Sequence, residues 1–255
     1  MTEQDLVVVT GGASGIGHAI ARRFTQAGHP VLVADINADA AATVAAELGT
    51  QALARTVDVA DDDGVAGFVA EVEADAGPIA VLVNSAGLLQ NQTTVADGDM
   101  AEHDRIWSVN YRGTYLMCRA VGPRMAARGG GAILNIASIN SYTPLPLPAY
   151  NPTKVAVDGL TRLLAAEWGA QGVRVNAVAP GFTRTPALQA RIDSGHRNEA
   201  GMAALSTLGR LVTPAEVAEA AYFLCSPAAS AITGVDLPID CGYMAAISYN
   251  SYPSS

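Results

Sequence analysis

Charged residues are scarce in this sequence: Asp, Glu, Lys and Arg make up 15 % of its 255 residues. The 15 basic residues form neither a run nor a basic–aromatic patch, and 24 acidic residues bring the formal charge to −9. Because nucleic-acid binding depends on clustered positive charge, we expect no nucleic-acid partner. The same negative field disfavours an acidic protein partner.

Cysteine is also rare. Cys118, Cys225 and Cys241 are widely spaced, and no CxxC pair occurs. An odd number of separated cysteines does not form a disulfide framework and lacks the spacing of a zinc site. We therefore predict free thiols in a reducing cytoplasm and no metal site.

Long apolar runs are missing as well. No window of about 18 consecutive apolar residues occurs, so we expect no membrane partner and no membrane span. The N-terminal MTEQDLVVVT contains two acidic residues and only a short apolar stretch. It resembles neither a signal peptide nor a transit peptide, which again favours a cytoplasmic protein.

Half of the residues are hydrophobic, and short β-branched runs alternate with Ala-rich helical stretches. Apolar strands separated by helices predict a mainly parallel, seven-stranded sheet with helices on both faces. No linker or repeat divides the chain, so residues 1–255 are interpreted as a single doubly wound Rossmann domain of the α/β class. The predicted strands are Leu6–Thr10, Pro30–Ala34, Ala52–Val57, Ile79–Val83, Ala132–Ala137, Val173–Val178 and Val235–Ile239.

Two late stretches look like loops by composition, 183–209 and the tail 242–255. The first is interpreted as a substrate loop or lid in which polar groups select hydroxylated substrates. The alternative, that these polar groups simply face solvent, carries equal weight. Whether the tail closes its own site or a neighbour's stays open. The apolar positions expected to dock a short helix over the cleft are Leu188, Ile192, Met202 and Leu205.

The sequence TGGASGIG at Thr10–Gly17 lies between the first predicted strand and a predicted helix, His18–Gly28. Glycines here allow a tight turn whose N–H groups approach a pyrophosphate, and the helix N-terminus adds partial positive charge. The spacing is GxxxGxG instead of the common GxGxxG, but strand and helix frame it as a dinucleotide site requires. A merely flexible glycine turn is the alternative. The predicted phosphate-binding residues are Gly11, Ser14, Gly15, Ile16 and Gly17.

Asp35 ends the second predicted strand and is followed by Ile36. A carboxylate there can accept hydrogen bonds from the adenosine ribose and repel a 2′-phosphate. No Lys or Arg occurs in Thr10–Gly17 or directly after Asp35, so NAD is favoured over NADP. Alternatively, Asp35 only caps the following turn. Asp58 and Val59 are expected to lie at the edge of the adenine ring. Alternatively, Asp58 caps the helix that begins near Asp61.

Later motifs add to this pattern. NSAG at Asn84–Gly87 follows the fourth predicted strand, Ser138 follows the fifth, and YNPTK covers Tyr150–Lys154. Asn110 lies inside SVNYRG, and PGFTRT covers residues 180–185. From Val7 to about Gly242 the chain resembles the short-chain dehydrogenase/reductase family. The length and the glycine spacing match its short branch, whereas the longer sugar-nucleotide epimerases need additional sequence.

The chemistry of carbonyl reduction asks for the same residue types. Hydride transfer to a carbonyl carbon needs a proton donor at the oxygen, and a free tyrosine has a pKa of about 10. Lys154 lies one helical turn after Tyr150 on the same face and is expected to stabilise its phenolate. Ser138 can hydrogen-bond the substrate oxygen. Each motif alone has a structural alternative. Tyr150 and Lys154 can be a surface pair, Ser138 a cap at the end of a strand, and Asn110 a residue of a helix kink.

The resemblance implies further roles. Asn110 would hold a water that links Lys154 to solvent, and Thr183 and Thr185 would fix the nicotinamide carboxamide. It also implies a homotetramer that pairs through helices near 102–127 and 152–171 and through the last strand. The catalytic set it implies is Asn110, Ser138, Tyr150 and Lys154. The cofactor-binding residues it adds are Asn84, Ala86, Gly87, Tyr150, Lys154, Pro180, Gly181, Thr183 and Thr185.

Two departures from the family pattern stand out. Ile139–Ala149 carries three prolines and places Tyr150 twelve residues after Ser138, one fewer than the resemblance implies. Prolines stiffen a loop, so this wall of the substrate pocket is expected to have its own shape. Cys241 stands where the family usually has glycine, and we expect it to be buried.

The leading interpretation is an NAD-dependent dehydrogenase of a secondary alcohol, with a small sugar, polyol or hydroxy-carbonyl compound as substrate. One alternative is a 3-oxoacyl-(carrier protein) reductase, which would prefer NADP and carry basic residues at the pocket mouth. Asp35 and the net charge of −9 count against it. A second alternative is a non-catalytic NAD-sensing protein, which the intact catalytic set disfavours. Steroid or aromatic-diol substrates stay open.

Overall fold

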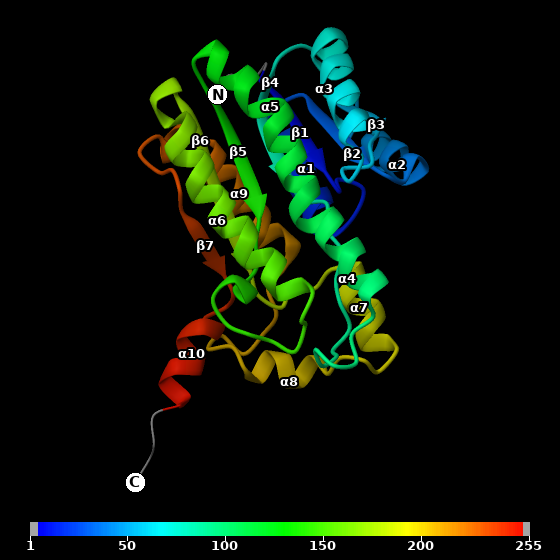
Figure 1. Ribbon diagram of the computed structural model, residues 1–255, viewed down its shortest axis with the longest axis vertical. Coiled ribbons are helices and arrows are strands. Elements are labelled where there is room, and N and C mark those ends of the chain that lie inside the picture. Colours follow the sequence, from blue (N-terminus) through cyan, green and yellow to red (C-terminus); the bar gives the residue numbers. More distant parts are fainter. Residues whose placement is uncertain (1–4, 252–255) are drawn as a thin grey trace.

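A computed structural model describes residues 5–251 of the chain. Seven strands form one sheet in which every neighbouring pair is parallel, in the order β3-β2-β1-β4-β5-β6-β7 (Figure 1). The order reverses between β1 and β4, and in such sheets ligands bind outside the carboxyl ends of the strands at that switch point. The strands are β1 (Leu6–Thr10), β2 (Val31–Asp35), β3 (Ala52–Thr56), β4 (Ile79–Asn84), β5 (Gly131–Ile136), β6 (Val173–Pro180) and β7 (Asp236–Ile239).

The predicted Rossmann fold is confirmed. All seven predicted strands are present, and their ends differ from the prediction by at most two residues. The sheet is entirely parallel, where a mainly parallel one was expected. Continuous apolar runs predict these strands well because a central parallel strand is buried on both faces.

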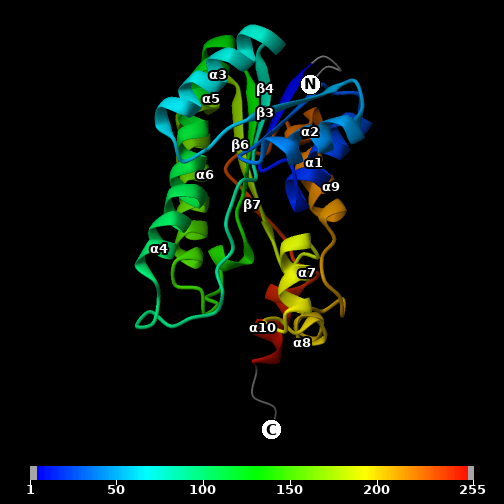
Figure 2. The same ribbon diagram turned by 90° about the vertical axis from the view of Figure 1, so that its right-hand side faces the viewer.

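Helices cover both faces of the sheet (Figure 2). In that view α1, α2 and α9 lie on one side, and α3, α5 and α6 lie on the other. The α-helices are α1 (Gly15–Gln26), α2 (Ala38–Leu48), α3 (Asp62–Ala76), α4 (Met100–Trp107), α5 (Thr114–Arg128), α6 (Tyr150–Trp168), α7 (Pro186–Asp193), α8 (Glu199–Ala204), α9 (Pro214–Cys225) and α10 (Tyr243–Asn250). A π-helical turn, η1 (Ser108–Gly113), joins α4 to α5, and the 3₁₀ turns are η2 (Ile139–Ser141), η3 (Gly169–Gln171) and η4 (Pro227–Ala229).

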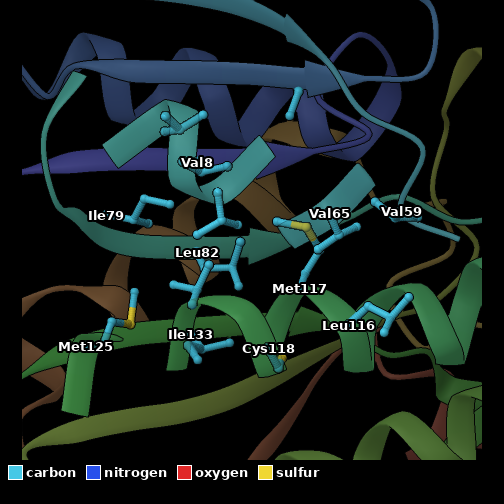
Figure 3. Close-up of a cluster of buried hydrophobic side chains, with 14 of the residues drawn as sticks. Val8, Val59, Val65, Ile79, Leu82, Leu116, Met117, Cys118, Met125 and Ile133 are labelled. Atoms are coloured by element: carbon cyan, nitrogen blue, oxygen red, sulfur yellow. The ribbon is translucent and has the colours of Figure 1, made fainter. Parts of the chain in front are cut away.

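Alternate residues of each strand face opposite helix layers. Val8, Leu82 and Ile133 point toward α3 and α5, where they pack with Met117 and Met125 in one buried cluster (Figure 3). The intervening strand residues belong to a second buried cluster with α1, α2 and α9. Strand side chains alternate with a period of two, so one apolar run supplies both layers of the core.

Helix starts follow local capping signals only in part. Thr213 and Glu216 form a reciprocal capping box at the start of α9. Asp61 is at the N-cap of α3, but its side chain makes no capping hydrogen bond. The predicted helix His18–Gly28 begins earlier, at Gly15, because the glycine turn itself forms its first turn.

The stretch 183–209 was expected to be a loop and contains two short helices, α7 and α8. Thr185 and Asn198 cap them, and Leu188 and Met202 pack together with Leu211 in a small buried cluster. Ile192 packs against that cluster, as predicted for a docked segment. Leu205 is 49 % exposed, so its predicted docking is wrong. Tertiary packing overrides the polar composition of the stretch.

The tail is also helical where a loop was expected, because α10 covers Tyr243–Asn250. Its last four residues, 252–255, lie outside the described part of the chain. Cys241, just before it, has φ 53, the left-handed conformation that favours the glycine expected at this position. It is partly buried against the second core cluster, close to the packing role predicted for it.

No helix within residues 5–251 is both long enough and apolar enough to cross a membrane. In the same residues, no group of three or more His, Cys, Asp or Glu side chains is arranged to hold a metal ion.

Candidate active site

Two cavities meet at the carboxyl ends of the strands. The larger cleft, of about 740 Å³, runs from the glycine turn past Asp35 to Lys154. The smaller pocket, of about 160 Å³, lies between Ser138, the proline-rich wall and α7. Tyr150 lines both, so its side chain stands where the two cavities join.

The glycine turn is packed backbone to backbone. A Cβ at Gly11, which has φ +62, would lie 2.7 Å from the Ala86 main chain, and one at Gly17 would lie 2.2 Å from the Gly11 carbonyl oxygen. Ser14 precedes α1 without a capping hydrogen bond, and the first turn of α1 has no acidic residue. Open N–H groups at a helix N-terminus suit a pyrophosphate. All five predicted phosphate-binding residues line the large cleft.

Asp35 braces the turn and also faces the cleft. Its Oδ2 accepts a hydrogen bond from the Ala13 N–H at 3.2 Å and its Oδ1 accepts one from the Asn37 N–H at 3.0 Å. The turn-capping alternative therefore describes part of its role, while the carboxylate still lines the large cleft beside exposed Ile36. Both uses are compatible, because a carboxylate offers about four acceptor positions.

Asp58 and Val59 line the far end of the same cleft. Asp58 Oδ1 accepts a hydrogen bond from the Ala60 N–H at 2.9 Å, a turn before α3 and not a cap of that helix. Arg105 on α4 lines this end too, and no local sequence signal predicted it. Its position follows from the packing of α4 beside the cleft.

The segment after β4 brings Ala86 and Gly87 to the cleft. The Thr10 hydroxyl holds it by accepting hydrogen bonds from the N–H groups of Ser85 and Ala86, at 3.2 and 3.3 Å. The Asn84 side chain is not brought there. It is buried, with its amide donating to Asn135 Oδ1 at 2.9 Å and to Cys118 Sγ at 3.3 Å.

Asn110 lies in the π-helical turn between α4 and α5. Its Oδ1 accepts a hydrogen bond from the Leu88 N–H at 2.7 Å, and its Nδ2 donates to the Leu88 carbonyl at 3.0 Å. Both ends of the amide therefore hold the loop that follows β4. The π-helical turn also agrees with the alternative that Asn110 is a residue of a helix kink. The side chain is buried, and the Asn110 main-chain carbonyl accepts a hydrogen bond from the Thr114 hydroxyl at 2.9 Å. The water expected at Asn110 stays a prediction.

Ser138, Tyr150 and Lys154 come together from β5 and α6. The Ser138 hydroxyl donates to Asn140 Oδ1 and accepts from the Asn140 N–H, both at 3.2 Å. Tyr150 and Lys154 share one face of α6, and Lys154 Nζ lies 5.4 Å from the centre of the Tyr150 ring. Lys154 Nζ donates to the Ile136 carbonyl at 2.7 Å.

Burial controls both titrating groups. It raises the pKa of Tyr150 to about 12, against a hydrogen bond with Ser138 and the charge of Arg191, which lower it. It lowers the pKa of Lys154 to about 8, against the charge of Asp236. In the protein alone, desolvation of the Tyr150 hydroxyl therefore outweighs the opposing effects of Ser138 and Arg191. Stabilisation of the phenolate by Lys154 stays a prediction.

Gln90 is a residue that the sequence did not identify. It is buried, and its Oε1 accepts hydrogen bonds from the N–H groups of Ala149 and Tyr150 at 2.9 and 3.1 Å. It therefore fixes the start of α6, where Tyr150 stands. The partners are about 60 residues away in sequence, so no local pattern indicates this contact.

All residues of PGFTRT except Arg184 line the small pocket. Thr183 is buried and donates to the Gly181 carbonyl at 3.0 Å, while the Thr185 hydroxyl caps α7 by accepting from Leu188 N–H at 3.2 Å. Thr185 also reaches the large cleft, whereas Pro180, Gly181 and Thr183 line only the small pocket.

Most polar side chains of the predicted lid face solvent. Gln189 bonds Asp193 on the outer side of α7, and only Arg191 and Arg197 among the polar lid residues after Thr185 line the small pocket. The structure therefore favours the alternative interpretation of 183–209, in which its polar side chains face solvent and do not select hydroxylated substrates. No described residue of the tail lines either cavity; Tyr243 instead packs edge-on against Phe182, with ring centres 5.4 Å apart.

A family model described as enoyl-(acyl carrier protein) reductase matches residues 11–244. D-threitol dehydrogenase of Mycolicibacterium smegmatis is 41 % identical over 93 % of this chain and 92 % of its own. A solved structure titled ribose-5-phosphate isomerase, from Brucella melitensis 16M, shares 41 % identity and a TM-score of 0.94, covering 99 % of this chain and 98 % of that one.

A second solved structure, a 3-ketoacyl-(acyl-carrier-protein) reductase from Brucella melitensis complexed with NADH, shares 36 % identity and a TM-score of 0.88 over 95 % of this chain and 99 % of that one. Such coverage extends the likeness over the glycine turn, the Ser138 and Tyr150 region and the lid. The chain is an oxidoreductase with a nucleotide-binding Rossmann fold, and it belongs to the short-chain dehydrogenase/reductase family.

Proposed function

We propose that this protein is an NAD-dependent dehydrogenase that interconverts a small secondary alcohol and its ketone. The observation that carries this is the position of Tyr150, which lines both the dinucleotide-shaped cleft and the small pocket. Interconversion of an alcohol and a ketone needs an acid/base beside the substrate oxygen, which must itself lie next to the cofactor. Ser138 on the pocket side and Lys154 on the cleft side complete the set.

The residues fit a nicotinamide dinucleotide. The backbone-packed glycine turn and the open start of α1 would hold the pyrophosphate, Asp35 the adenosine ribose, and Thr185, Ala86 and Gly87 the region nearer Tyr150. Hydride exchange with the carbon of the alcohol is the chemistry that a bound nicotinamide would supply.

The chain's own residues handle the proton. In alcohol oxidation the Tyr150 phenolate takes the hydroxyl proton, and Ser138 donates a hydrogen bond to the substrate oxygen as charge develops there. Positive charge from Lys154, and from a nicotinamide ring, favours the phenolate that burial otherwise disfavours. Lys154 is buried although it lines the large cleft, and the proposed link from it to bulk water is a water held at Asn110.

Asp35 supports NAD over NADP, because a 2′-phosphate would meet its carboxylate and no described basic side chain of the glycine turn offsets the repulsion. The wild-type protein is expected to prefer NAD by at least about tenfold in kcat/KM, which corresponds to about 1.4 kcal/mol. Asp35→Ala should erode this preference and, by removing the brace on Ala13, weaken binding of both cofactors. Steady-state kinetics with NAD and NADP measure it.

The exposed Asp39→Ala is the matched control, since Asp39 lies one turn further on, in α2. Equal use of NAD and NADP by the wild-type protein would contradict the role given to Asp35. An unchanged preference in Asp35→Ala would contradict it as well.

The substrate class is best approached by a screen of alcohols and ketones with both cofactors, followed at the absorbance of reduced nicotinamide. A small polyol is supported by the likeness to D-threitol dehydrogenase. The carrier-protein reductase remains the second candidate, supported by the description of the family model and by one solved relative. It predicts fast NADPH-dependent reduction of acetoacetyl thioesters, which the dehydrogenase does not.

A further inference from the structure

The small pocket combines apolar walls with two positive charges. Leu145, Leu147, Phe182 and Leu188 are among its apolar lining residues. Arg191, in the last turn of α7, and Arg197, a few residues beyond it, line the same space. Uncharged polar side chains also line the pocket, and Gln90, Ser138, Asn140, Thr183 and Thr185 already have hydrogen-bond partners in the protein. The two arginines are the charged residues of this lining, and their charge calls for an explanation.

These two guanidinium groups lack the partners that most arginines of this chain have. Among the described residues 5–251, neither Arg191 nor Arg197 has a carboxylate within 4.0 Å. The charge of Glu102 acts on Arg191 only from beyond that distance. The arginines that do pair with a carboxylate are Arg22, Arg23, Arg55, Arg112, Arg119, Arg124, Arg128, Arg162, Arg184 and Arg210.

Arg191 is half-buried and held in place by main-chain groups. Its Nη1 donates to the Gln90 carbonyl at 2.7 Å, and its Nη2 is 3.4 Å from the Leu89 carbonyl. A guanidinium has five N–H groups, so three are left to bind something else. Burial and then the charge of Arg197 lower the pKa of Arg191. Two neighbouring cations in a partly desolvated site are unfavourable until an anion lies between them.

Arg191 is bound to the same residue as the start of α6. Gln90 holds Arg191 through its carbonyl and holds the N–H of Tyr150 through its side chain, at 2.7 and 3.1 Å. One residue therefore links the Arg191 guanidinium to the main chain of Tyr150. The pocket volume of about 160 Å³ suits a compact substrate.

We propose that Arg191, with Arg197 beside it, binds an anionic group of the substrate, so that the enzyme acts on small hydroxy acids whose carboxylate is carried on a short apolar skeleton. The inference rests on the proposed dehydrogenase function and narrows its substrate class. Charge-assisted and bidentate binding of a carboxylate is what a planar guanidinium does best.

A purely structural role for Arg191 makes a different prediction. In that role its two hydrogen bonds only strap α7 to the loop at Leu89 and Gln90. Removing the strap would loosen the lid and impair every substrate alike. The test must therefore compare substrates that differ in charge but not in shape.

The experiment uses the full-length protein and pairs of alcohols, 3-hydroxybutyrate with 3-hydroxybutyramide and 4-hydroxycyclohexanecarboxylate with its carboxamide, plus D-threitol as a neutral polyol. We expect kcat/KM for the better acid to exceed that for its amide by at least about tenfold. Arg191→Met should remove this ratio, mainly through a higher KM for the acid, while amide oxidation changes by less than about threefold. Arg191→Lys should keep part of the ratio, and Gln189→Ala on the outer side of α7 is the matched control.

A binding measurement keeps the two proposals apart. Isobutyrate and isobutyramide are titrated into the protein with saturating NADH, followed by nicotinamide fluorescence. Tighter binding of isobutyrate that Arg191→Met abolishes supports the anion site, even if no alcohol of the panel is oxidised. In that case the dehydrogenase proposal is what fails.

The anion site is refuted if amides or D-threitol are oxidised at least as well as the acids and isobutyrate binds no better than isobutyramide. It is equally refuted if Arg191→Met lowers acid and amide oxidation by the same factor, because that is the behaviour of a strap. A phosphorylated secondary alcohol without a carboxylate, sn-glycerol 3-phosphate, forms the last arm. If it outperformed both acids, the site would bind phosphate, and the carboxylate assignment would be wrong.

Discussion

Tyr150→Phe is expected to lower kcat by about 10²-fold or more and to leave the affinity for NADH nearly unchanged. The magnitude is the usual one for removing a general acid or base. The hydroxyl stands where the two cavities join, whereas the ring itself packs as before, so phenylalanine removes the proton carrier and little else. Stopped-flow or steady-state kinetics with the best alcohol, together with NADH titration, measure both quantities.

The pH dependence adds a second measurement. Burial raises the pKa of Tyr150 to about 12 in the protein alone, so the phenolate that oxidation requires is a minor species near neutral pH. The oxidation rate of the wild-type enzyme should therefore increase with pH until the tyrosine of the loaded enzyme is ionised. Alcohol oxidation in Tyr150→Phe should lose this limb. Lys154→Ala should remove charge that favours the phenolate and move the limb to higher pH.

Tyr115→Phe provides the control, because Tyr115 lies half-exposed on α5, away from both cavities. Near-normal turnover in Tyr150→Phe would rule out its assignment as the acid/base. So would a pH profile that stays the same in the variant.

Gly17→Ala is expected to abolish measurable cofactor binding and to destabilise the fold by about 1–3 kcal/mol, the usual cost of overpacking. A Cβ at this position would lie 2.2 Å from the Gly11 carbonyl oxygen and 2.8 Å from the Gly11 carbonyl carbon. Both are main-chain atoms, so they cannot rotate away as a side chain would. The turn must open, and the N–H groups around the phosphate site separate.

Gly67→Ala in α3 is the matched control, because a Cβ there meets nothing within 4 Å. Alanine in a helix interior should instead stabilise the protein by about 0.5–1 kcal/mol. Urea unfolding gives the two free energies, and NADH titration gives the affinity. If Gly17→Ala bound NADH normally, the turn would not be the phosphate site, whatever its stability.

The fold followed from sequence to a large extent. The apolar β-branched runs at Val7, Leu82 and Val175 predict central strands because only a strand covered on both faces is apolar without interruption. The glycine turn could be recognised for a similar reason. The turn needs residues without a Cβ at particular positions. Only glycine meets that need, so the turn is visible in the sequence as the spacing of Gly11, Gly15 and Gly17.

The short helices of the lid were harder to predict. Polar composition at 183–209 favours a loop, and the helices α7 and α8 exist because Leu188 and Met202 bury against Leu211. Isolated helices of this length are marginal in water, so tertiary contacts decide whether they form. The same holds for α10 in the tail.

Residue types and their spacing by themselves determined the sheet, the phosphate turn and the identity of Ser138, Tyr150 and Lys154 as a set. Only the tertiary structure decided that Asn84 turns away from the cleft and that Gln90 holds both Tyr150 and Arg191. Strand and turn preferences act between residues close in sequence, whereas these contacts join groups about 50 to 100 residues apart. Their geometry is fixed by how helices and loops pack on the finished sheet, which no local pattern encodes.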